Sequence, residues 1–63
     1  MSVFEVTSSH AHAVFKDEND AINALWLIGF YHDFNIDYKA VKQALDDKNY
    51  YEKFPICIVK ADV

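Results

Sequence analysis

The sequence predicts a small α+β domain with the element order β-β-α-α-β, in which an antiparallel sheet carries two packed helices. Three segments rich in β-branched and aromatic residues predict the strands, and two segments with capping residues and helical spacing predict the helices. The chain has 63 residues, so we expect a single domain. A domain of this size buries only about 60% of the surface of its unfolded chain and usually needs further support, such as a second chain.

Two strands are predicted near the start of the chain. Residues 3–7 and residues 11–15 are both rich in strand-forming residues. They form either a hairpin or one long bent strand, because Ser8-Ser9 between them lacks the glycine or asparagine of tight hairpin turns. Of these two arrangements, we expect the hairpin.

The last strand is predicted over residues 54–59, where apolar residues occupy both faces. Such a strand lies inside a sheet or is covered on both sides. Pro55 has no N–H to donate, so it belongs near the strand start or on an edge. Cys57 lies between two isoleucines, and we therefore expect a buried structural thiol rather than a catalytic one.

The first helix is predicted over residues 18–33. Asp17 or Asn19 can cap it, and its acidic first turn suits the positive end of the helix dipole. Within it, residues 21–31 are apolar except for Asn23. A helix packed on one side needs an apolar stripe of only about 100°. This helix therefore predicts two partners, the sheet and a second chain.

The surplus apolar face of the first helix predicts a homodimer. An exposed apolar patch above a few hundred Å² is unusual for a soluble monomer. We expect the dimer interface to be formed by the large side chains of this helix: Trp26, Leu27, Phe30 and Tyr31.

The second helix is predicted over residues 38–48, with Asp37 as its cap and Asn49 at its end. Its apolar residues form one stripe at helical spacing: Tyr38, Val41, Ala44 and Leu45. This is the pattern of a helix that buries a single face.

Seven large aromatic rings form a further group of candidate residues: Trp26, Phe30, Tyr31, Phe34, Tyr50, Tyr51 and Phe54. We expect about half of them in the core, and the others suit the centre of a protein interface, where aromatic residues are enriched. Tyr50 and Tyr51 lie in a polar segment that predicts irregular structure. They are therefore candidates for binding a partner.

The net charge is −4, and the chain has no arginine. Neutralisation of phosphates supplies most nucleic-acid affinity, so we expect no nucleic-acid partner. Two acidic clusters could steer a protein partner with a basic or mixed surface: Asp17, Glu18 and Asp20, and Asp46 with Asp47. The alternative interpretation of these clusters is helix capping and a solvated face.

His10 and His12 are the candidate metal ligands. Residues two apart on a strand share a face, so both imidazoles could bind one zinc or nickel ion, with His32 or Asp33 completing the site. The alternative is that both histidines are polar residues on a solvated strand face. We expect no metal and no other cofactor.

No membrane segment is predicted. The apolar run of residues 21–31 is short, because a membrane-spanning helix needs about 20 residues. The first residues lack the basic and long apolar regions of a signal peptide, and a single cysteine fits a reducing compartment. We therefore expect a cytoplasmic protein, in the host cytoplasm if the source is viral.

These features predict a non-enzymatic protein-binding module. Its size, acidity and lack of a catalytic motif are similar to those of small accessory proteins that viruses and mobile elements encode to bind and inhibit a host protein. The alternative is a metal- or small-ligand-binding protein that uses the His10 and His12 face or an aromatic pocket at a dimer interface. If the tyrosines and acidic clusters contact no partner, we expect the binding surface on the exposed side of the sheet, around Glu5, Thr7 and these histidines.

Overall fold

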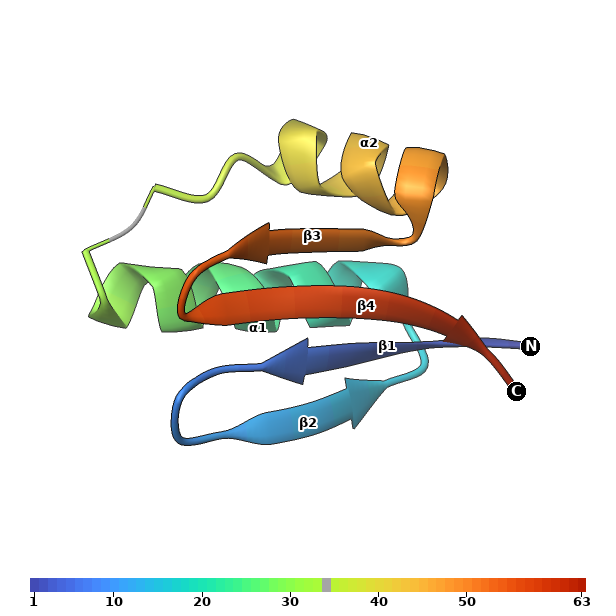
Figure 1. Ribbon diagram of the computed structural model, residues 1–63, viewed down its shortest axis with the longest axis horizontal. Helices are drawn as coiled ribbons and strands as arrows, with labels where there is room; N and C mark the ends of the chain where they lie inside the picture. Colours follow the sequence, from blue (N-terminus) through green and yellow to red (C-terminus); the bar gives the residue numbers. More distant parts are fainter. Residues whose placement is uncertain (34) are drawn as a thin grey trace.

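The computed structural model describes residues 1–33 and 35–63. These residues form four strands and two helices: β1 (Ser2–Thr7), β2 (His12–Phe15), α1 (Glu18–Tyr31), α2 (Tyr38–Lys48), β3 (Tyr50–Lys53) and β4 (Ile56–Asp62). The strands form an antiparallel sheet in the order β2-β1-β4-β3, with α1 across one face and α2 beside β3 (Figure 1). The α+β class and the two helices are confirmed, and a strand is added to the predicted order.

The prediction of an irregular segment around Tyr50 and Tyr51 is wrong, because residues 50–53 form β3. This strand and β4 form a hairpin in which Tyr50 lies opposite Val59. Half of the residues in β3 are charged, so its sequence lacks the apolar pattern of a strand. This strand is formed by pairing with β4, which no local pattern reveals.

β4 begins and ends later than the predicted range of 54–59. Phe54 and Pro55 form the turn of the hairpin and are joined by a cis peptide bond. Because β4 lies between β1 and β3, the prediction of a strand inside the sheet is confirmed. The helices cover only one of its two apolar faces.

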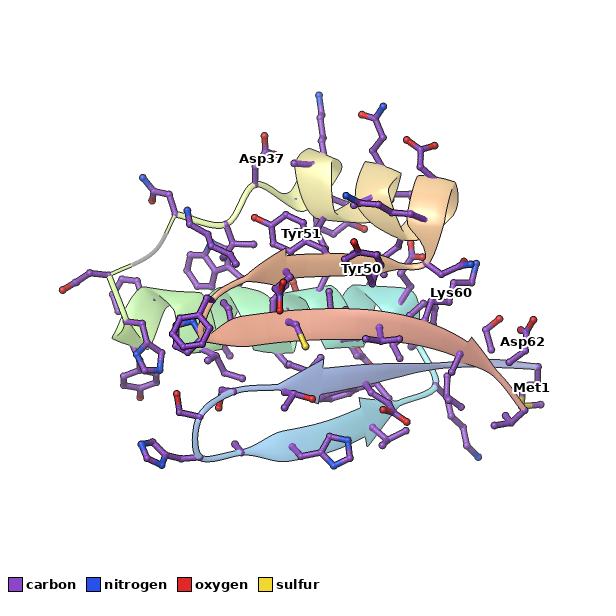
Figure 2. All side chains as sticks on the ribbon, in the orientation of Figure 1. Met1, Asp37, Tyr50, Tyr51, Lys60 and Asp62 are labelled. Carbon is purple, nitrogen blue, oxygen red and sulfur yellow. The ribbon has the colours of Figure 1, made fainter. Side chains whose placement is uncertain are left out.

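β1 and β2 form the expected hairpin. Phe4 pairs with Phe15 near its open end, and the Ser8 N–H donates to the Ala11 carbonyl at 2.8 Å in the turn. The ends of the chain meet on the two central strands, where the Val63 N–H donates to the Met1 carbonyl at 2.8 Å. Figure 2 shows Met1 and Asp62 together at this end of the molecule.

α1 begins at its predicted cap and ends two residues earlier than predicted. The Asp17 carboxylate accepts a hydrogen bond from the Asp20 N–H at 3.1 Å. The last helical residue is Tyr31, and Asp33 has a left-handed backbone with a φ of 59°. This left-handed residue turns the chain out of the helix.

α2 matches its predicted bounds. The Asp37 carboxylate accepts from the Lys39 N–H at 3.0 Å, which satisfies a donor of the first turn. At the other end, Asn49 has a φ of 66°, the left-handed conformation that asparagine tolerates at a helix C-terminus. Val41 and Leu45 are buried, whereas Tyr38 is exposed.

The core lies between the helices and one face of the sheet. Its buried side chains come from β1, β4, both helices and the segment before α2: Phe4, Val6, Ala21, Ile22, Leu25, Ile36, Val41, Leu45, Ile56 and Ile58. The expectation that about half of the seven aromatic rings from Trp26 to Phe54 named above lie in the core is wrong for the described residues. Tyr51 is half-buried and five others are exposed, while Phe34 lies outside the described residues. Aliphatic side chains fill the thin core instead.

Candidate protein-binding surfaces

The sheet has an uncovered face opposite the helices. Side chains alternate between faces along a strand, and the buried Phe4 and Val6 identify the covered face of β1. The strand registers therefore place one residue from each strand in a continuous line on the other face: Val14, Glu5, Val59 and Tyr50. Opposite residues on neighbouring strands have Cβ atoms about 4.5–5.5 Å apart. We call these four residues the open-face row.

The open-face row is mainly apolar and accessible. Val14, Val59 and Tyr50 are exposed, and Glu5 is half-buried between the two valines. Of this row, the sequence predicted Tyr50 as a partner-binding residue and Glu5 as part of the alternative surface on the sheet. The two valines were missed. For Val59 the reason is that apolar residues on both faces of β4 do not reveal which of them point outward.

A parallel row on the same face contains His12, Thr7, Cys57 and Glu52. Cys57 is only half-buried, so the expectation of a core thiol is wrong. Its neighbours Ile56 and Ile58 point into the core, and alternation along β4 turns Cys57 to the uncovered face.

Tyr50 and Tyr51 come from the same strand but lie on opposite faces of the sheet (Figure 2). Tyr51 packs against the core, and Tyr50 is exposed on the open face. The Lys48 ammonium lies over the Tyr50 ring, 5.1 Å from its centroid. The two candidate tyrosines therefore lie on different faces of the sheet, and Tyr50 is the more exposed of the two.

The two acidic clusters lie at the same end of the long axis, because α1 begins where α2 ends (Figure 1). Asp46 and Asp47 are exposed in the last turn of α2. In the other cluster, Asp17 caps α1 and Glu18 bonds to Lys42. Helix capping is therefore established for part of this cluster, and the exposed Asp20, Asp46 and Asp47 are the carboxylates more available for steering a partner.

Glu18 and Lys42 connect the two helices. The Lys42 ammonium donates to the Glu18 carboxylate at 2.6 Å. This hydrogen bond, with the attraction between the two charges, raises the pKa of Lys42 above its ordinary value of 10.5. Nearby, the Tyr38 hydroxyl donates to the Asn19 side-chain oxygen. Both contacts hold the start of α1 against α2.

The outer face of α1 carries the four residues predicted to form a dimer, and all four are exposed. Their exposed fractions are 49% for Trp26, 53% for Leu27, 65% for Phe30 and 85% for Tyr31. Trp26 and Phe30 stack, with ring centroids 5.8 Å apart. Across residues 1–33 and 35–63, neither helix has the length and apolar character needed to cross a membrane. We call these four residues the α1 outer face.

A pocket of about 190 Å³ borders the α1 outer face. It lies between α1, α2 and the segment before α2, and its lining residues are Ile22, Asn23, Trp26, Ile36 and Tyr38. The two isoleucines are buried and form its apolar floor. The volume is comparable with one large side chain or a small aromatic molecule.

The two candidate metal ligands do not share a strand. β2 begins at His12, whereas His10 lies in the preceding turn, so the same-face argument does not apply to the pair. The His12 Nε2 atom lies 3.8 Å from a Glu5 carboxylate oxygen. Within the part of the chain that the structure describes, no three His, Cys, Asp or Glu side chains are grouped to hold a metal ion.

Comparison with protein-family models, with curated proteins and with solved structures finds no match for this chain. The candidate binding sites are the two uncovered apolar surfaces, the open-face row and the α1 outer face.

Proposed function

We propose that the protein is a non-enzymatic protein-binding module that binds a partner protein on the open face of its sheet. The observation that carries this proposal is the open-face row, a line of four side chains across the sheet that neither helix covers and in which only Glu5 is charged. Uncovered apolar surfaces rimmed by polar groups are typical of protein interfaces. Tyr50 is the anchor of the contact, because tyrosine is enriched among the residues that dominate binding energy.

The charges around the open face define the partner's chemistry. Glu5 lies within the row and Glu52 lies in the neighbouring row on the edge strand, while the Lys48 ammonium over the Tyr50 ring is the cation at this face. With a net charge of −4, the chain attracts a surface that offers lysine or arginine beside apolar side chains. Asp46 and Asp47 contribute to the approach from the end of α2. By occupying such a surface, the protein inhibits the partner's other contacts, as expected for a viral accessory protein acting on a host protein.

Affinity capture from the cells in which the chain is made tests this function. Wild-type protein and Gln43→Lys should capture the same partner, whereas Val59→Lys should not. The two substitutions change the net charge equally, but Gln43 is an exposed residue of α2, whereas Val59 lies in the open-face row. Capture by Val59→Lys at the wild-type level would contradict the proposal, provided that circular dichroism shows both variants folded.

Binding rates separate the contributions of the two sets of residues. Replacing Asp46 and Asp47 by asparagine should slow association at low salt with little change in dissociation, because rim charges act on the approach. Tyr50→Ala should speed dissociation, with a loss of about 2 kcal/mol or more if the ring is central. Equal rates for all variants would place the contact away from these residues.

The pocket beside Trp26 favours a second candidate function, binding of a small apolar ligand. Its lining offers an indole ring, a phenol ring and the Asn23 amide around an apolar floor. Toluene is a suitable probe, because it is apolar and aromatic. Saturable quenching or shifting of Trp26 emission by toluene, lost in Ile22→Phe, would support this function. A linear response without saturation would contradict it.

A further inference from the structure

We propose that a second copy of this chain covers the α1 outer face, with the two α1 helices antiparallel and Leu27 of each copy against Phe30 of the other. The surface is distinct from the open face, because the buried residues of α1 point to the sheet and the outer face points away from it. The inference therefore goes beyond the proposed function. A dimer of this kind leaves both open faces free for partner proteins.

The exposed apolar area is sufficient for two copies to associate. Aromatic side chains present roughly 150–250 Å² each, so the exposed fractions of the α1 outer face correspond to roughly 500 Å² per chain. An isolated monomer rarely exposes a larger apolar patch. Two such faces bury roughly 1,000 Å² together, which reaches the lower bound for a specific interface. We therefore expect a dimer of moderate affinity.

Charge favours a second copy as the occupant. The stretch from Ala21 to Tyr31 has no charged residue, so it offers nothing that selects a basic or an acidic partner. In the antiparallel arrangement, the two Glu18 side chains lie about 30 Å apart at 1.5 Å per residue. This separation exceeds the screening length of about 8 Å in physiological salt. The acidic first turns therefore do not oppose association.

The positions of the four side chains fit a two-fold axis. Leu27 and Phe30 lie about 60° apart around the helix and straddle the middle of the exposed face. A two-fold axis level with the midpoint between them places each Leu27 opposite Phe30 of the other copy, as a self-complementary interface requires. Trp26 and Tyr31 flank this central pair on either side. The Trp26–Phe30 stack already orders two of the rings before association.

Sedimentation equilibrium at micromolar concentrations tests the dimer. Wild-type protein should approach twice the chain mass, and Gln43→Glu, an exposed control on α2, should do the same. Leu27→Glu and Phe30→Lys should each sediment as monomers with an unchanged circular dichroism spectrum. A monomeric wild-type protein, or a Leu27→Glu variant that dimerises like wild type, would overturn the proposal.

Mixing the two monomeric variants tests the antiparallel register. The introduced carboxylate and ammonium face each other only if position 27 contacts position 30 of the other copy, so the equimolar mixture should regain the dimer mass. A mixture that stays monomeric would overturn this register.

If a variant fails to fold, dilution of wild-type protein provides the test, because Trp26 emission should shift as the mass halves. Constant emission across that range would overturn the placement of Trp26 in the interface. If the wild-type protein were monomeric but still captured a partner that Val59→Lys did not capture, the dimer proposal would fail and the proposed function would stand.

Discussion

Leu25 and Leu27 lie on opposite sides of α1, although only one residue separates them. Leu25 is completely buried against the sheet, whereas about half of the Leu27 side chain is exposed to solvent. The same residue type therefore has a structural role at one position and a surface role at the other.

Substitution of these two leucines should separate folding from association. Leu25→Ala should lower the free energy of unfolding by about 2–5 kcal/mol, because it leaves a cavity in a small core. Leu27→Ala should change the stability of the monomer by no more than about 0.5 kcal/mol. Urea unfolding at a concentration too low for association measures both values. Equal losses would contradict the assignment of the two sides of α1.

Tyr50 and Tyr51 should respond differently to truncation. Tyr51→Ala should destabilise the fold by about 1–3 kcal/mol, because its ring packs against the core. Tyr50→Ala should cost about 0.5 kcal/mol or less, mainly the contact with the Lys48 ammonium. Thermal unfolding measures the difference. A larger loss for Tyr50 than for Tyr51 would show that the faces of β3 are assigned the wrong way round.

Cys57 should react with a thiol reagent at an intermediate rate in the native protein. The side chain is half-buried on the open face, so native labelling should be slower than in denaturant but much faster than global unfolding would allow. A bound partner on the open face should protect the thiol. Labelling only at the rate of global unfolding would contradict the placement of Cys57 on the open face.

The contact between Glu18 and Lys42 should make stability depend on alkaline pH. The pKa of Lys42 is raised in the folded chain, so the contact contributes fully below the ordinary value of 10.5 and is lost as the pH rises through the raised pKa. Lys42→Gln should therefore lower the melting temperature at neutral pH, and the deficit should shrink above pH 10.5. High salt should shrink it as well, because the pair is partly exposed.

Lys39→Gln is the matched control for this pair. It removes the same charge from the same helix, at an exposed position. Its melting temperature should follow that of wild-type protein across the alkaline range. If Lys39→Gln and Lys42→Gln lost the same stability, the effect would come from net charge rather than from the contact with Glu18.

Helix positions could be predicted from the sequence because their signals are local. Asp37 and Asn49 mark the two ends of α2 through hydrogen bonds and backbone preferences within a few residues of themselves. The surplus apolar surface of α1 could also be predicted, since residues 21–31 contain more apolar side chains than one packed face requires. Composition and helical periodicity determine these features before the chain folds.

Only the tertiary structure decided how the sheet is completed and which side chains remain outside. β3 depends on pairing with β4, and the polar residues of β3 give no local indication of that pairing. β4 is apolar on both faces, so its sequence is compatible with either Cys57 or Ile58 in the core. The cross-strand register and the packing of α1 choose Ile58 and leave Val59 and Tyr50 on the open face. Cross-strand pairing joins residues that are distant in sequence, and for that reason the alignment of Val14, Glu5, Val59 and Tyr50 in one row emerged only from the fold.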